Sequence, residues 1–194
     1  NQNKRDDSKI LLDINKLVNE QFSENLKNDI NAKAYLLKRN ISEDMIDSFN
    51  LGLSKDSWDN ITELLNKIKK TKEGLDLGLL VKNKDKIYDR FRNRIMFPIK
   101  NTSGNIIAFG GRTLSKDDNA KYINSPESIL FYKSSEVYGL FESKKYINKV
   151  DQVIVVEGYT DVIALHQNGI KNAVAALGTA FTKFHINKLL RYSK

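Results

Sequence analysis

The sequence predicts a mixed α/β protein, of the α+β kind in its first part and of the α/β kind at its end. Apolar residues recur at helical spacing over residues 1–80, whereas from residue 152 the pattern is strand, helix, strand, helix. Between them, from residue 86, the pattern changes towards a period of two, which predicts a β-hairpin. We therefore expect an N-terminal α/β subdomain over residues 1–150 and the start of a parallel-sheet domain over residues 151–194.

Two apolar stripes indicate the N-terminal helices. Their members are Ile10, Leu11, Ile14, Leu17, Val18 and Phe22 in the first, and Ile61, Leu64, Leu65 and Ile68 in the second. Ser42 and Ser57 are expected to cap two of the helices. Residues 95–99 and 106–109 flank a turn-forming segment and predict the hairpin, as part of a small mixed sheet. Residues 134–147 are predicted to be helical.

An acidic residue follows the apolar run 153–156, which predicts a buried strand. Glu157 lies at the exit of this strand, where open α/β sheets bind their ligands. Asp161 follows in the first turn of the next predicted helix, so that two carboxylates meet at one edge of the sheet. The alternative is an acid that ends a strand and a second one favoured by the helix dipole. Two parallel strands with their crossover helix cannot cover both faces of a sheet, so we expect this domain to continue beyond Lys194.

Composition and charge restrict the possible functions. The 194 residues contain 40% hydrophobic residues, and no signal peptide or apolar run long enough to cross a bilayer is evident, which predicts a soluble, cytoplasmic protein. The chain has no cysteine, and its two histidines, His166 and His185, are too far apart for a zinc motif. The net charge of +8 favours a polyanionic partner, although a lysine-rich solvated surface gives the same value.

Three arginines alternate along residues 90–94. On a strand, Arg90, Arg92 and Arg94 would point from one face at a spacing of about 6.6 to 6.8 Å. This row suits consecutive phosphates because a guanidinium group binds phosphate oxygens in pairs. The alternative is an edge strand that is protected by its charge. Two glycines before Arg112 are expected to leave that arginine exposed as well.

Residues 121–127 are a candidate nucleotide-binding loop. Lys121, Tyr122 and Asn124 place a cation, an aromatic ring and an amide within four residues. Alone, this signal is weak, because a structural loop closed by a Ser-Pro pair is the more common outcome.

Seven segments, in order, resemble blocks of the catalytic core of bacterial DNA primase of the DnaG type. They are residues 35–39 (YLLKR), 58–60 (WDN), 89–99 (DRFRNRIMFPI), 109–112 (FGGR), 121–127 (KYINSPE), 138–140 (YGL) and 156–162 (VEGYTDV). One block can arise by chance, but not seven in one order. The resemblance implies a primase-core subdomain followed by the first half of a Toprim domain. It also implies DNA-templated synthesis of short RNA primers for DNA replication, by metal-dependent nucleotidyl transfer from ribonucleoside triphosphates.

The resemblance implies roles for individual residues. Glu157 would be the catalytic Toprim glutamate that holds Mg²⁺ or Mn²⁺, with Asp161 supporting the site. The nucleotide-binding residues would be Arg39, Lys121, Tyr122, Asn124 and Lys133, and the nucleic-acid-binding residues Arg90, Arg92, Arg94 and Arg112. The family completes its metal site with an Asp-x-Asp pair, which does not follow Leu177 here. We therefore expect residues 1–194 alone to make no primers.

The implied partners are a single-stranded DNA template, the RNA primer, nucleoside triphosphates and guanosine alarmones, at the replication fork. No membrane partner is expected. The family's zinc module and its module for binding the replicative helicase are not in this sequence, so zinc and the helicase would act through those modules. Two alternatives remain open: a non-catalytic module that binds single-stranded DNA or nucleotides, and another Toprim enzyme, such as a nuclease or a topoisomerase.

Overall fold

The computed structural model describes the backbone of residues 2–194 and the side chains from residue 7 onward. The helices in this part of the chain are α1 (Gln2–Lys27), α2 (Ile30–Lys38), α3 (Glu43–Ser48), α4 (Asn60–Lys67), α5 (Thr71–Asp76), α6 (Leu140–Val150), α7 (Tyr159–Gln167) and α8 (Lys183–Leu189). The strands are β1 (Gly52–Ser54), β2 (Leu80–Asn83), β3 (Lys86–Asp89), β4 (Arg94–Lys100), β5 (Ile106–Thr113), β6 (Tyr122–Asn124), β7 (Ile154–Val156) and β8 (Ala173–Ala175). None of these helices has the length and apolar content needed to cross a bilayer.

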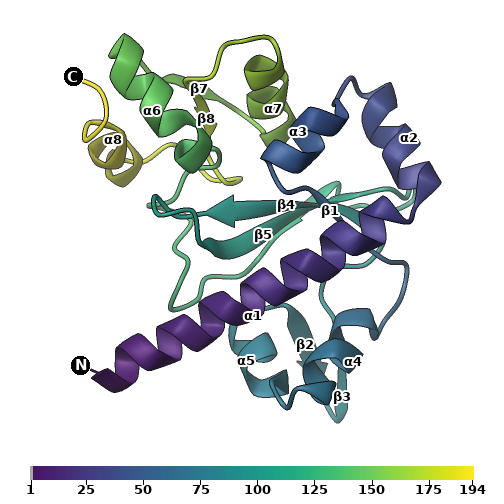
Figure 1. Ribbon diagram of the computed structural model, residues 1–194. Coiled ribbons are helices and arrows are strands. Elements are labelled where there is room, and N and C mark those ends of the chain that lie inside the picture. The colour runs from purple at the N-terminus through teal and green to yellow at the C-terminus, as the bar shows by residue number, and fades with distance from the viewer. Residues whose placement is uncertain (1) are drawn as a thin grey trace.

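A four-stranded sheet in the order β1-β4-β5-β6 lies at the centre of the molecule (Figure 1). Strands β4 and β5 pair antiparallel from Arg94 with Thr113 to Lys100 with Ile106, which confirms the predicted hairpin. All pairs of this sheet are antiparallel, so the expected mixed sheet is wrong. The pair of β7 with β8 is parallel and forms a separate sheet. Parallel neighbours need a crossover connection, and α7 provides it.

Helix α1 lies across one face of the central sheet (Figure 1). Its stripe of Leu11, Ile14, Val18 and Phe22 packs in one cluster with Met96 of β4. At Gly52 of β1, an added Cβ would lie 2.5 Å from the Cβ of Phe22, so glycine is needed for this close approach. The first predicted apolar stripe is therefore confirmed as a buried helix face for these four residues, whereas Ile10 is exposed and Leu17 is half-buried.

The opposite face of β4 belongs to a second core cluster. Ile95, Phe97 and Ile99 alternate with Met96 along the strand and pack with Tyr159 and Val162 of α7. The segment after residue 150 thus shares a continuous core with the segment before it. The division at residue 150 coincides with the end of α6 and stays a prediction as a domain boundary.

Some predicted element ends are confirmed and others are wrong. Ser42 caps α3 by accepting a hydrogen bond from the amide of Met45. Ser57 caps no helix and instead donates to Asp59, while the start of α4 is capped by the buried carboxylate of Asp89, which accepts from the amides of residues 61 and 62. The last predicted helix of the first subdomain begins at Leu140 rather than at residue 134, because a β-bridge between residues 138 and 175 precedes it.

Candidate nucleic-acid interface and acidic strand end

A surface hollow of about 820 Å³ lies between the end of α2, the end of β5 and the start of β6. The residues that line it are Tyr35, Lys38, Arg39, Arg112, Thr113, Leu114, Ser115, Lys116, Asp118 and Lys121. Five of the ten are cationic, and the single acid, Asp118, is paired with Arg94. Charges of one sign around a concave surface concentrate the field, so this hollow suits a phosphate-bearing ligand.

Arg112 forms part of this hollow. The sequence predicts an exposed arginine, but Arg112 is buried. Its side chain is 7% exposed, its Nε donates to the hydroxyl of Tyr35 at 2.7 Å, and one terminal nitrogen donates to the hydroxyl of Tyr122 at 2.5 Å. The preceding glycines add no side chain, but aromatic residues from α2 and β6 cover the arginine instead. Arg112 therefore presents a guanidinium group that is held in place before any ligand arrives.

The predicted row of three arginines is wrong. Strand β4 begins only at Arg94, and Asn93 has a φ of 49°, which is left-handed and breaks the alternation of a strand. Arg94 is 5% exposed, donates to the carbonyls of Gly111 at 3.3 Å and Ala120 at 2.9 Å, and pairs with Asp118. Burial lowers the pKa of Arg94 from its ordinary value. The guanidinium group of Arg94 is thus occupied by contacts within the protein and supports the fold.

Arg90 and Arg92 lie in different surroundings. Arg90 is half-buried, burial lowers its pKa, and its Nε has no hydrogen-bond partner among the described residues. Arg92 lies over the ring of Trp58, with its Cζ 3.8 Å from the ring centroid, and Tyr88 meets the same indole edge to face. Since Trp58 is 62% exposed, Arg92 and Trp58 form a flat cationic surface open to solvent.

The predicted nucleotide-binding residues do not all gather at the hollow. Arg39 and Lys121 line it, and Arg39 lies over the ring of Tyr35 at 4.9 Å. Tyr122 and Asn124 belong to β6, so the segment expected to be a loop is partly a strand, paired with β5. Lys133 is not among the lining residues, and its carbonyl accepts a hydrogen bond from His185 Nε2 at 2.9 Å.

The acidic strand end is where the sequence predicts it, but strand β7 is not the buried strand expected, because Val155 is 43% exposed and its two neighbours are half-buried. Glu157 directly follows β7 and is exposed, and within the described residues its side chain makes no hydrogen bond or ion pair. Asp161 Oδ2 accepts a hydrogen bond from the amide of Gly158 at 3.1 Å, as an acid in the first turn of a helix does. Among the described residues, no group of three or more His, Cys, Asp or Glu could hold a metal ion. Glu157 and Asp161 alone therefore do not complete a divalent-cation site.

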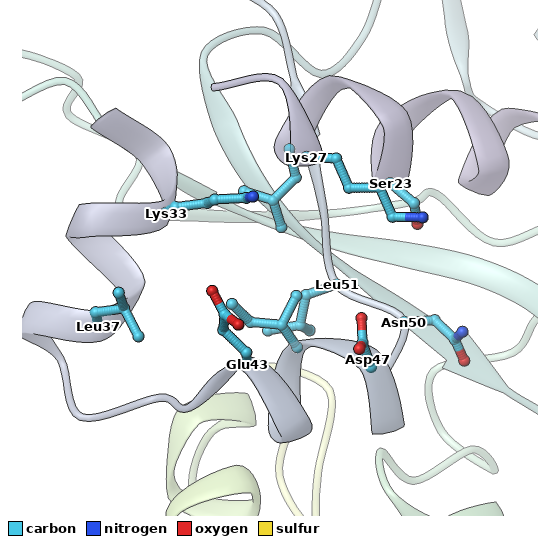
Figure 2. Close-up of a pocket in the computed structure, with 10 residues that line it drawn as sticks. Ser23, Lys27, Lys33, Leu37, Glu43, Asp47, Asn50 and Leu51 are labelled. Atoms are coloured by element: carbon cyan, nitrogen blue, oxygen red, sulfur yellow. The ribbon is translucent and has the colours of Figure 1, made fainter. Parts of the chain in front are cut away.

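A second pocket, of about 290 Å³, lies between α1, α2 and α3 (Figure 2). Lys27 and Lys33 extend over it from α1 and α2, and Glu43 and Asp47 rise from α3 on the other side. It shares no lining residue with the basic hollow. Because its charges are of both signs, it does not favour a polyanion.

Comparison with known proteins identifies the family. Residues 21–144 match the family model described as the DNA primase catalytic core, N-terminal domain, and residues 151–194 match the model of the Toprim domain. The chain belongs to the DNA primase family. This confirms the resemblance, and both matches agree with a primase-core subdomain followed by the start of a Toprim domain.

Relatives and solved structures agree with this assignment. The DNA primase of Pseudomonas aeruginosa is 50% identical over 163 residues, which cover 82% of this chain and 24% of the relative. The primase structure from Aquifex aeolicus, comprising zinc-binding and RNA polymerase domains, has a TM-score of 0.91 at 33% identity and covers 97% of this chain and 47% of that one. A DnaG primase catalytic domain bound to single-stranded DNA has a TM-score of 0.89 at 38% identity, covering 100% and 62%. The chain spans about a quarter of the length of the first curated relatives that it matches.

The sequence-based prediction missed three residues of the two cationic surfaces. Lys38 and Lys116 line the hollow, and Trp58 carries the stacked Arg92. Lys38 and Trp58 lie inside two of the primase-like blocks, which is the signal that could have identified them. Lys116 lies in a loop without any motif, and only the fold brings it next to α2.

Proposed function

We propose that this chain forms part of a primase that synthesises short RNA primers on a single-stranded DNA template, by nucleotidyl transfer from nucleoside triphosphates. The observation that carries the proposal is the hollow with five cations and its link to the acidic strand end: Arg112 of the hollow donates to Tyr122, whose ring lies 6.0 Å from that of Tyr159, two residues after Glu157. A primase must hold polyanions on one side and place carboxylates at the reacting phosphate on the other. The solved relative that was bound to single-stranded DNA supports the choice of template.

The hollow supplies the binding part of this function. Arginine forks hold phosphate oxygens in pairs and lysines add point charges, so Arg39, Arg112 and Lys121 are proposed to contact phosphates of the template or of an incoming nucleotide. Guanosine alarmones present the same phosphate chemistry and are proposed to compete there. Lys133 and Asn124 stay candidates for a nucleotide that extends beyond the hollow.

Glu157 is proposed to supply one oxygen ligand to Mg²⁺ or Mn²⁺, which in such enzymes neutralises charge that develops on the transferred phosphate. Asp161, whose carboxylate binds the Gly158 amide, would keep the start of α7 ordered beside it. These two residues do not form a complete site by themselves. The RNA primer and the replicative helicase, the latter through a separate module, are further proposed partners, at the replication fork in the cytoplasm.

The basic hollow predicts a salt-dependent affinity for single-stranded DNA. Replacing Arg39 and Lys121 with alanine should weaken binding and lower the slope of log K against log salt by about 0.7 for each phosphate contact removed. Lys67 and Lys149, which are exposed and do not line the hollow, provide the matched double-alanine control. Fluorescence anisotropy with labelled oligonucleotides at several salt concentrations measures both slopes. Equal slopes for the wild type and the hollow variant would contradict the assignment.

The Trp58–Arg92 surface is expected to stack on an unpaired base. Trp58 is the only tryptophan in the sequence, so its intrinsic fluorescence reports on this place directly. Single-stranded DNA should quench it, and Trp58→Ala should cost about 1 to 3 kcal/mol of binding free energy, as for one stacked base. Trp58→Phe, which keeps an aromatic ring, should recover part of the loss. Unchanged fluorescence at saturating DNA would exclude Trp58 from the interface.

A further inference from the structure

Tyr159 anchors the acidic strand end to the central sheet. It follows Glu157 by two residues, begins α7 and is 5% exposed. Its ring stacks on Phe97 of β4, with centroids 5.1 Å apart and an interplanar angle of 13°, and meets Tyr138 edge to face at 4.7 Å. The first turn of α7 is therefore packed against the sheet that carries the hollow, although Glu157 itself is exposed.

One directed hydrogen bond sets the place of this ring. The hydroxyl of Tyr159 donates to Oδ1 of Asn124 at 2.6 Å, and Nδ2 of Asn124 donates to the carbonyl of Leu177 at 2.9 Å. Asn124 thus binds the start of α7 and the segment after β8 at once. Tyr122, two residues earlier on β6, accepts the hydrogen bond from Arg112 and lies 6.0 Å from the Tyr159 ring. The short strand β6 therefore contacts both Arg112, which lines the hollow, and Tyr159, which lies two residues after Glu157.

The position of Tyr159 also depends on Gly110. A Cβ added at Gly110 would lie 2.6 Å from Cε2, Cζ and the hydroxyl oxygen of Tyr159, closer than real Cβ contacts allow. Gly110 is the partner of Asn124 across β5 and β6. Any larger residue would displace the ring away from Asn124, so Gly110 gives a second, independent way to disturb the same contact.

We propose that Tyr159 is a positioning residue, which acts through Asn124 to hold Glu157 at a set place relative to the nucleic acid in the hollow. The inference rests on the proposed function and adds to it the element that joins its two sites. Phosphate transfer requires the reacting groups to be aligned closely, and a displacement of about 1 Å can cost about 100-fold in rate. A shift of α7 would move Glu157 while leaving the cations of the hollow in place.

The test compares Tyr159→Phe and Gly110→Ala with the wild type in the full-length protein. Tyr159→Phe removes one oxygen and keeps the ring. Its matched control is Tyr146→Phe on α6, which removes a hydroxyl that interacts with Lys145 of the same helix and with Lys171, which follows α7. We expect kcat for primer synthesis to fall between about 10- and 100-fold in both test variants. The dissociation constant for template DNA should stay at the wild-type value, and Tyr146→Phe should behave as the wild type.

A merely structural role would show a different pattern. If the melting temperature, the DNA affinity and kcat all fall together in Tyr159→Phe, or if kcat is unchanged there, the inference is overturned. Gly110→Ala tests the same contact from the other strand, and if it fails to fold, Tyr159→Phe decides alone. A wild-type protein that makes no primers would overturn the proposed function and this inference with it, whereas an active wild type with unaffected variants overturns only the inference.

Discussion

Replacing Glu157 with glutamine in the full-length protein is expected to abolish primer synthesis and to leave the affinity for single-stranded DNA nearly unchanged. The substitution keeps the volume of the side chain but removes the charge of a proposed metal ligand. Metal-based charge stabilisation contributes several kcal/mol to such transition states, so the rate should fall by at least about 100-fold. Because Glu157 is exposed and makes no hydrogen bond or ion pair with the described residues, no contact in the fold depends on its charge.

The measurement is primer synthesis on a single-stranded template with Mg²⁺, together with anisotropy of a labelled template. Glu63→Gln, at an exposed glutamate of α4 that lies outside the hollow and the primase-like blocks, is the matched control and should keep wild-type rates. Wild-type synthesis by the Glu157→Gln variant would remove Glu157 from the catalytic site. Nicking or relaxation of a plasmid by the wild type, without primer synthesis, would favour the nuclease or topoisomerase alternative. We expect residues 1–194 alone to bind DNA without making primers, and synthesis by them unaided would also contradict the assignment of Glu157.

Replacing Arg94 with methionine is expected to destabilise the protein by about 2 to 3 kcal/mol, because two hydrogen bonds from a charged donor are lost in a buried place. The guanidinium group binds the carbonyls of Gly111 and Ala120 and joins β4 to the loop before β6. Methionine fills similar space but donates to neither carbonyl. Urea unfolding followed by circular dichroism measures the free energy of unfolding.

Arg92→Met is the informative comparison for Arg94→Met. Arg92 lies two residues earlier, over an exposed tryptophan, and makes one hydrogen bond to the backbone, to the carbonyl of Asp89 at 2.5 Å. Its loss should therefore weaken DNA binding and lower the free energy of unfolding less than the loss of Arg94. The two arginines should therefore separate into one that supports the fold and one that contacts DNA. If both variants weaken DNA binding equally and keep the same free energy of unfolding, the two arginines contact DNA alike, and the division into a structural and a DNA-binding arginine is wrong.

Several parts of the fold follow from local pattern alone. The stripe of α1 is predicted because one helix face carries Leu11, Val18 and Phe22, and this periodicity does not depend on what packs against it. The hairpin of β4 and β5 is predicted by the turn chemistry of residues 101–105, where the Asn101 side chain accepts from the amides of residues 103 and 105. Glu157 is placed at a strand exit because an apolar run ends there.

The surroundings of the arginines could not be predicted in the same way. An alternation of Arg with other residues is typical of a strand, but the left-handed backbone at Asn93 ends that pattern, and no local signal reveals it. Arg112 is covered by Tyr35, which is 77 residues away in the chain, so its burial arises only from long-range packing. Lys116 reaches the hollow for the same reason.

The sequence by itself determined the family blocks, the helical and strand periodicities and the position of one acidic residue at a strand end, because each depends on residues close together in the chain. The tertiary structure alone decided which cations surround one hollow, which arginines are buried and how Tyr159 joins the strand end to β6. The physical reason is that exposure, charge pairing and hydrogen-bond partners arise between residues far apart in sequence. An arginine in solvent and an arginine buried under a tyrosine therefore cannot be distinguished from the sequence alone.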